Sequence, residues 1–526
     1  MARSGVNNFG LRFGIETALG IKPTTGWRLL EPNNPSAFGA TITTVERRPI
    51  SPDRGRKKGT VVNAESSVEY EGDMTVDAFD DFAEGFVFAE YANKEFVFKT
   101  TGGLLPPPVA SSTTWTIDSL STLMGTKLID PVVGSSPLVY AKGYTNAANN
   151  GLHVLTTDSA STDVILTAGG SSLVTETPSA NASLQVAGIR MAVGDVAFTV
   201  SGSTATLVSG ADIADWSVIG LFPGQYIHIG SDDDAGVLQN GLGDGTDNYG
   251  YARITSISGA TINLDKLDVN LATDAVTTVV TDIMFGRFLR NVPVTATGDD
   301  NEFLERSYAF EGAYADLGGI GTDEYEYALG NFANELVINL PLNDKSTATW
   351  GFIGTTTEDI TASRSTGPSS AVSPLRTEAF NTASGIASIT TDVVSLASDV
   401  CFKSLTLTLK NNVSPENCLG TLGAVFMNSG LFEVNLEGQM LFTNKEIVNA
   451  VKNNTTVTFA SIMKNSDGAI VIDIPSLTFG DGQREFPVDA SVLVNISGLA
   501  FNDPTGTVPD VSLGISLFAK VPEARA

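Results

Sequence analysis

The chain has 526 residues, of which 42% are hydrophobic and 17% charged, so it can bury sizeable cores and is not disordered overall. Its formal net charge of −28 argues against a protein that binds nucleic acid tightly, because such affinity comes from Lys and Arg neutralising phosphates. Two cysteines exclude a disulfide-built scaffold, and no apolar run approaches the roughly 18 residues of a membrane-spanning helix.

The first hundred residues contain a basic loop followed by a strongly patterned strand. Met1 to Asn8 lack the apolar stretch of a secretory signal, so we expect synthesis in the cytoplasm with both thiols reduced. The basic residues of the loop are Arg47, Arg48, Arg54, Arg56, Lys57 and Lys58. Apolar residues then alternate along one face of the strand, at Val62, Ala64, Val68, Tyr70, Met74 and Val76. The other face is acidic, with Glu65, Glu69, Glu71 and Asp73. Like charges along a strand repel one another, so this face indicates more than solubility.

A short helix is predicted directly after this strand. In this prediction Asp77 caps its start, Gly85 ends it, and Phe79 and Phe82 pack inward. The chain elsewhere has 52 glycines and many short alternating runs separated by turn residues, which is typical of an all-β fold.

Two segments after the first hundred residues share one motif of strand, glycine turn, strand, turn and strand. The first copy contains Leu138–Gly143, Asn149–Val154 and Val164–Leu166, and the second contains Tyr226–Gly230, Asn248–Ile254 and Ala260–Leu264. We interpret them as small β-barrel or sandwich modules at 105–190 and 191–286.

The earlier alternation resumes from Arg287 onward. Glu433 and Glu437 lie opposite an apolar face that contains Val434 and Leu436, which repeats the acidic pattern of Glu65 to Asp73. A second helix is predicted from a capping box that begins at Thr443. The simplest interpretation is one split β-sandwich or barrel domain, formed by residues 1–104 and 287–526, that the two modules interrupt.

No catalytic or metal centre emerges from the other chemically active residues. His153 and His228 are interpreted as partly exposed strand residues, and Cys401 and Cys418 have no nearby His or second cysteine pair for zinc. An acidic group in the second module could hold calcium but lacks the EF-hand spacing, and is interpreted as a solvated loop: Asp232, Asp233, Asp234, Asp244 and Asp247.

Several motifs together resemble the major tail tube proteins of long-tailed, siphovirus-like bacteriophages. They are the basic loop Ile50–Arg56, the strand Val68–Asp73 with the helix Asp77–Phe82, the strands Tyr325–Asn331 and Glu335–Leu340, and Leu405–Asn412 with Leu419 and Gly420. The resemblance covers 1–104 and 287–526, and the two modules depart from the minimal pattern.

The resemblance implies a structural virion protein without enzymatic activity or cofactors. Six subunits would close a ring, and rings would stack into a hollow tube with the tape measure and terminator proteins as partners. DNA would pass through the tube without specific binding. The candidate bore-facing residues are then Glu65, Glu69, Glu71, Asp73, Glu433 and Glu437, although an outer or inter-subunit face stays open for them. The basic loop, Arg47–Lys58, is a candidate inter-ring contact, with a solvated hairpin loop and a nucleic-acid contact as alternatives.

Two other classes of protein remain as rivals at this point. A multi-domain surface adhesin would fit the tandem β modules but would need a secretion signal. A carbohydrate-binding or carbohydrate-active β protein would need an aromatic-lined cleft with paired carboxylates. The four tryptophans are scattered along the sequence instead, at Trp27, Trp115, Trp216 and Trp350.

Overall fold

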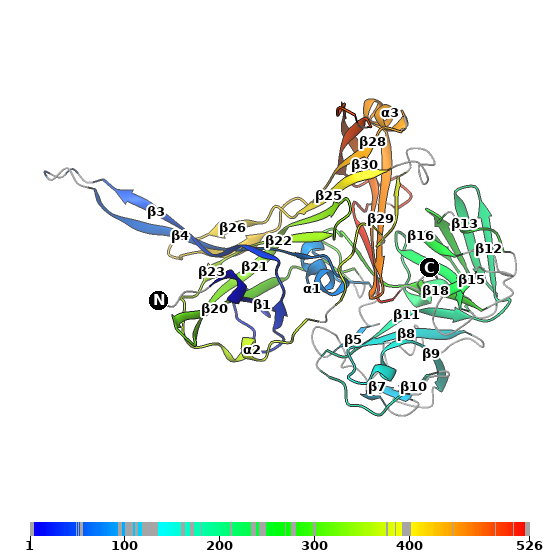
Figure 1. Cartoon of the computed structure of the whole chain (residues 1–526), viewed down its shortest axis with the longest axis horizontal. Helices are drawn as coiled ribbons and strands as arrows, with labels where there is room; N and C mark the ends of the chain where they lie inside the picture. Colours follow the sequence, from blue (N-terminus) through cyan, green and yellow to red (C-terminus); the bar gives the residue numbers. More distant parts are fainter. Residues whose placement is uncertain are drawn as a thin grey trace.

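A computed structural model shows an all-β chain with two large sheets (Figure 1). It describes residues 5–520 except 49, 51, 53–55, 93–96, 100–108, 111–113, 118–134, 159–163, 169–172, 180, 211–212, 233–237, 241–248, 269, 275–279, 298–300, 375–376, 384, 392–400, 444, 490 and 509. The predicted all-β class is confirmed. The expected boundary at 104/105 lies outside the described residues.

The first sheet has 16 strands and joins the two ends of the sequence. Its strands are β1 (Phe9–Ile15), β2 (Arg28–Leu30), β3 (Asn34–Arg47), β4 (Lys57–Asp73), β19 (Arg287–Arg290), β20 (Ser307–Gly319), β21 (Thr322–Pro341), β22 (Thr347–Gly354), β23 (Thr356–Thr357), β24 (Ile386–Thr391), β25 (Phe402–Lys410), β28 (Glu433–Leu441), β29 (Thr456–Asn465), β30 (Gly468–Glu485), β31 (Leu493–Ala500) and β32 (Gly514–Phe518). A separate hairpin pairs β26 (Ser414–Asn417) with β27 (Ala424–Asn428).

The second sheet has 14 strands and takes the middle of the sequence. Its strands are β5 (Val97–Lys99), β6 (Val109–Ala110), β7 (Thr114–Ile117), β8 (Ser136–Lys142), β9 (Gly151–Asp158), β10 (Val164–Ala168), β11 (Ser183–Met191), β12 (Val196–Ser201), β13 (Thr204–Ser209), β14 (Tyr226–Asp232), β15 (Leu238–Asn240), β16 (Gly250–Ser258), β17 (Thr261–Asp265) and β18 (Thr281–Phe285). Because β11 pairs with both β8 and β18, the segments 105–190 and 191–286 share this sheet.

The main core lies inside the 16-stranded sheet and is built around helix α1 (Val76–Val87). Phe82 is fully buried and its ring packs against Phe13, Tyr308, Phe352 and Trp350 with centroids 4.5–5.5 Å apart. Each large aromatic side chain buried in this way contributes about 1.5–3 kcal/mol. The helix is therefore held to β1, β20 and β22 by one cluster of aromatic rings.

The predicted ends of α1 were wrong. The N-cap is Thr75, whose hydroxyl accepts a hydrogen bond from the Ala78 amide at 3.1 Å, and the helix runs through Gly85 to a left-handed C-cap at Phe88. Gly85 is needed for packing, because a Cβ there would lie 2.2 Å from the Tyr308 hydroxyl. A tertiary contact, and not a turn, explains this glycine.

Helix α3 (Glu446–Asn453) forms without the expected capping box. Its N-cap is Lys445, which makes no side-chain capping bond, and Ile447, Val448 and Ala450 form its buried side. Val451, which the spacing of apolar residues along this helix also predicts to face inward, is only partly buried against the core. The third α-helix of the described residues, α2 (Thr366–Ser369), is a single turn.

A buried seam joins the two sheets. Tyr226 and Tyr251 from the 14-stranded sheet pack with Ile462, Val471 and Phe518 from the 16-stranded sheet. Within the seam, the guanidinium of Arg253 bonds Asp473 at 2.9 Å and Asp265 at 2.7 Å. Burial raises the pKa of Asp473, while Arg253 acts in the opposite direction. Breaking a buried pair of this kind typically costs about 3–5 kcal/mol, so the seam holds the sheets in one orientation.

The expectation that both histidines are partly exposed was wrong. His153 on β9 and His228 on β14 each retain 4% of their accessible surface. The ring of His228 lies edge-on to Tyr251, with centroids 4.8 Å apart, because β14 is covered by the other sheet at the seam. Sequence alternation alone cannot reveal this second covering layer.

We predict that acidification weakens the seam through His228. Burial, with a smaller contribution from Lys464, lowers the pKa of His228 to about 3, whereas an unfolded histidine titrates near 6.5. The folded state thus favours the neutral ring, and this stabilisation is complete above about pH 6.5 and is lost as the pH falls toward 3. At pH 5 the loss is about 2 kcal/mol, from ~1.36 kcal/mol per pH unit.

Chemical denaturation at pH 7 and pH 5 measures this loss. His228→Gln has no titrating ring, so its free energy of unfolding should depend on pH less than that of the wild type by about the same ~2 kcal/mol. An identical pH dependence in the two proteins would contradict the assignment.

Candidate functional site: an acidic sheet face and a projecting basic hairpin

The six acidic residues singled out in the sequence lie on one face of one sheet. The pairing of β4 with β22, β22 with β21, β21 with β25, and β25 with β28 places them in common cross-strand rows. One row consists of Glu69, Gly351, Glu335, Lys410 and Glu433. Another consists of Asp73, Thr347, Asn339, Thr406 and Glu437. Two strands 360 residues apart in sequence thus contribute to a single surface.

The opposite face of the same strands forms the core. Tyr70, Trp350, Leu336 and Leu409 are all buried and alternate with the residues of the acidic face. Because successive side chains point to opposite sides of a strand, burying these residues turns the carboxylates outward. None of the acidic residues singled out in the sequence is among the buried polar residues.

The acidic face carries an excess of negative charge. On β4, β22, β21, β25, β28 and β31 it bears the acids Glu65, Glu69, Glu71, Asp73, Glu335, Glu433 and Glu437, and the one base Lys410. Lys410 bonds Glu335 at 3.1 Å, with both side chains about two-fifths exposed. Lys345, in the turn before β22, bonds Asp73 at 2.6 Å. Exposed pairs of this kind are worth about 0–1 kcal/mol and leave the face negative.

Sequence reasoning missed Glu335 and Lys410. The signal for Glu335 was present, because it alternates with Leu336 and Ile338 as Glu433 does with Val434 and Leu436. Nothing in the sequence shows that Lys410 would stand between Glu335 and Glu433, since that depends on the register of three strands.

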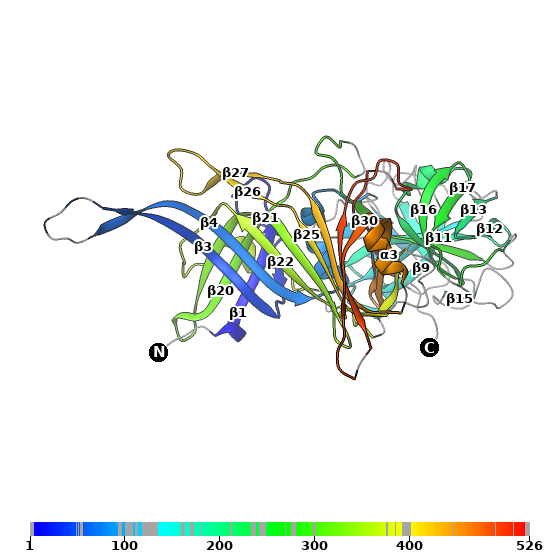
Figure 2. The same ribbon diagram turned by 90° about the horizontal axis from the view of Figure 1, so that it is seen from above.

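The basic loop lies at the tip of a long hairpin formed by β3 and β4. Figures 1 and 2 show this hairpin extending from the body on the side opposite the 14-stranded sheet. Arg47, Arg48, Arg56, Lys57 and Lys58 are exposed there, whereas Arg54 lies outside the described residues. Arg48 and Arg56 each bond Glu46, at 2.9 and 2.7 Å. The tip therefore keeps a net positive charge.

The apolar face predicted for the start of β4 is not part of the core. Val62 remains 49% exposed, and Val61, Val45 and Ile42 on the same hairpin are 46–59% exposed. The hairpin leaves the body near Ser66, which is buried, so the alternation continues beyond the point where a core exists to cover it. A second layer must come from elsewhere if these residues are to be buried.

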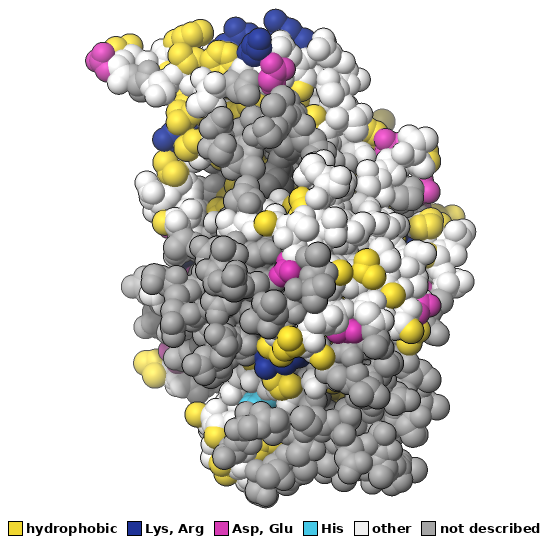
Figure 3. Space-filling view, turned by 90° about the vertical axis from the view of Figure 1, so that its right-hand side faces the viewer, with side chains coloured by type: hydrophobic (Ala, Val, Ile, Leu, Met, Phe, Trp, Pro, Cys, Tyr) yellow, Lys and Arg dark blue, Asp and Glu magenta, His cyan; other side chains and the backbone are white. Residues whose placement is uncertain are grey.

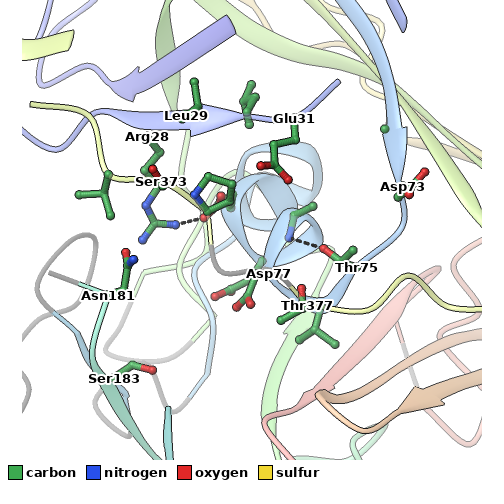
Figure 4. Close-up of a pocket in the computed structure, with 18 of the residues that line it drawn as sticks. Arg28, Leu29, Glu31, Asp73, Thr75, Asp77, Asn181, Ser183, Ser373 and Thr377 are labelled. Atoms are coloured by element: carbon green, nitrogen blue, oxygen red, sulfur yellow. Dashed lines mark hydrogen bonds and ion pairs between the residues drawn. The ribbon is translucent and has the colours of Figure 1, made fainter. Parts of the chain in front are cut away.

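A cavity of about 320 Å³ lies where the start of α1 meets the 14-stranded sheet (Figure 4). Asp77 points into it from α1, and Asn181 and Ser183 line it from the other sheet. Ion pairs cross or border it: Lys142 bonds Asp77 at 2.5 Å, Arg287 bonds Asp80 at 2.6 Å, and Arg28 bonds Asp81. Of these pairs, Lys142–Asp77 joins the two sheets, whereas the other two tie α1 to β19 and β2 of the 16-stranded sheet. The cavity is therefore bordered by a second contact between the sheets.

The face of the molecule formed by the 14-stranded sheet differs from the acidic face. Its described acidic side chains are scattered singly among uncharged ones, and Lys and Arg gather above it, at the top of the view and at the level of α3 (Figure 3).

The described residues contain no group of three or more His, Cys, Asp or Glu that could hold a metal ion. Cys401 and Cys418 are exposed free thiols. Asp233, Asp234, Asp244 and Asp247, from the acidic group considered for calcium, lie outside the described residues. None of the helices in the described part of the chain has the length and apolar composition needed to cross a bilayer.

A comparison with models of protein families finds a match. A family model described as "phage tail tube protein" matches residues 7–512, a range that includes every strand of the two sheets except β32 and all the described members of the acidic face and the basic hairpin. A search of curated proteins finds no match.

Proposed function

The chain belongs to the phage tail tube protein family, and on that premise we propose that its copies close into rings that stack into a hollow tube for the passage of phage DNA. Membership makes it a structural protein of the virion tail. Tape measure and terminator proteins are the further partners that this role requires. Residues 1–104 and 287–526 would form the tube domain, and residues 105–286 would be inserted modules.

The acidic face is the observation that supports this function most directly. Its carboxylates stand on the surface of a continuous sheet whose other side is the core, so a ring of such sheets gives a smooth negative wall. At physiological salt, screening acts over about 8 Å, so phosphates are repelled only near the wall. DNA then moves along the channel without adhering to it.

The projecting hairpin supports the contact between rings. It exposes Ile42, Val45, Val61 and Val62 along its length and basic residues at its tip. Burying four such side chains against the next ring contributes several kcal/mol, at about 25 cal/mol per Å² of apolar area. The positive tip suits the strongly negative chain above or below it.

We predict that reversing the charge of the acidic face slows DNA delivery but leaves tubes intact. In the variant Glu65→Lys, Glu69→Lys, Glu433→Lys and Glu437→Lys, only exposed or partly exposed side chains of the acidic face change, and the core does not. Adhesion of about 1.4 kcal/mol is enough for a tenfold effect, so ejection should slow at least tenfold. Time-resolved DNA release from assembled particles measures it.

The matched control carries Gln at the same four positions. It removes charge without adding attraction, so its delay should be smaller than that of the Lys variant. Ejection by the Lys variant at the wild-type rate would remove the acidic face from the mechanism while leaving the tube itself in place.

We predict that the variant Arg56→Glu, Lys57→Glu and Lys58→Glu folds but no longer assembles into tubes. These side chains are exposed on the hairpin, so the free energy of unfolding should change by no more than about 0.5 kcal/mol. Repulsion between the reversed tip and the acidic neighbour should abolish stacking. Negative-stain microscopy counts the tubes, and circular dichroism checks the fold.

The corresponding Gln variant separates loss of charge from its reversal, and it should assemble more weakly than the wild type. Tubes of normal length from the Glu variant would contradict an inter-ring role for the hairpin tip.

A further inference from the structure

The 16-stranded sheet contains the same arrangement of strands twice. In the first half, each strand pairs with the next in the order β1, β20, β21, β22, β4, β3. In the second half the order is β24, β29, β30, β31, β28, β25. The chain order matches as well: β4 leads into α1 as β28 leads into α3. The two halves are therefore two copies of one fold, each of which we call a tube unit.

The acidic residues occupy equivalent places in the two units. Glu69 pairs with Gly351 on β22, and Glu437 pairs with Ser497 on β31, its counterpart. Asp73 pairs with Thr347, and Leu441 with Leu493, in the same way. The separation in sequence between Glu65 and Glu433 is the same as that between Glu69 and Glu437. Each unit thus contributes its own acidic strand to one face.

The two units are joined edge to edge. β21 of the first unit pairs with β25 of the second from Glu335–Lys410 to Pro341–Ser404, which makes the sheet continuous across the junction. In the second unit, β30 corresponds to β21, and in the first unit, β3 corresponds to β25. The molecule therefore already shows how one unit binds the next.

Among the described residues, the two tube units each leave one sheet edge unpaired, β3 in the first unit and the end of β30 in the second. Within the described part of the chain, β3 pairs only with β4, and residues 479–485 of β30 pair only with β31. Unpaired edges of this kind invite another strand. Pro35 on β3 and the bulge between Asp481 and Arg484 on β30 are features that occur at sheet edges.

We propose that β30 of one chain pairs with β3 of a second copy, so that three chains close a ring of six tube units. This inference rests on the tube function proposed above and changes its expected stoichiometry from six chains to three. Gly480 on β30 corresponds to Glu335 on β21, and Thr41 on β3 corresponds to Lys410 on β25. Because Glu335 and Lys410 pair within the chain, Gly480 would pair with Thr41 of the neighbouring chain, with the two strands antiparallel. Around the ring, the β21–β25 contact within each chain then alternates with the β30–β3 contact between chains. Because the two contacts are equivalent, the ring can close.

A cysteine pair tests both the contact and the number of chains. Thr41→Cys and Gly480→Cys are combined in a chain whose natural thiols are removed by Cys401→Ser and Cys418→Ser. Directly opposed residues of antiparallel strands have Cα atoms about 4.5–5.5 Å apart, within the range of a disulfide. A Cβ at Gly480 meets only the Ser497 hydroxyl, at 2.9 Å, so the substitution is tolerated. Oxidised tubes should yield covalent species that end at the trimer in denaturing electrophoresis.

The control places the second cysteine one strand further from the edge, at Ser497, which shares the row of Gly480. Strands are about 4.8 Å apart, so Thr41→Cys with Ser497→Cys should give no covalent product. A ladder that continues to six chains, or tubes without any cross-link from the Gly480 pair, would overturn the three-chain ring and leave the tube function standing. Failure of the unsubstituted protein to form rings or tubes would overturn the tube function itself.

Discussion

The alternation of side chains along an extended strand is the constraint on which this structure depends. A strand that alternates strictly can serve a core and a charged surface together, and a slip of one residue exchanges the two. For β4 such a slip would drive Glu69 into the space of Val68 and Tyr70, where nothing could compensate a carboxylate. The acidic face is therefore as firmly specified as the core behind it. Surface charge and core packing are two outcomes of one register.

The sequence predicted the strands and the outward carboxylates because both are local consequences of that alternation. It could not predict that Glu69 and Glu433 share a row, since the row passes through three strands whose partners are distant in sequence. Val62 shows the opposite limit. Its pattern is indistinguishable from that of Val68, yet the hairpin carries it beyond the body and leaves it exposed. Alternation gives the face of a residue, whereas only the assembled layers determine whether that face is covered.

The predictions of the ends of α1 and of the exposure of the histidines were wrong for a related reason. Asp77 and Thr75 are both good caps by residue type, and the backbone geometry selects Thr75, which leaves Asp77 free to bond Lys142 across the junction with the second sheet. Gly85 has the signature of a helix end, but it serves the approach of Tyr308. His228 alternates like a surface residue and is buried by a second layer. In each case a contact between distant segments decided among local choices that were nearly equal.

If residues 105–286 are an insertion, as we propose, the second half of the large sheet also explains how the first half can carry it. From α3 to β29 the chain needs only Asn454 and Thr455, whereas from α1 to the equivalent β20 it passes through the whole 14-stranded sheet. The topology of the unit is complete without that sheet, so the connection tolerates extra chain if the ends of the insertion stay close together. The seam around Arg253 and Asp473 then provides what a simple insertion lacks, a fixed orientation. Because Asp473 lies in the part of β30 that pairs on both sides, with β29 and with β32, the second sheet is anchored to an interior strand and not to a loop.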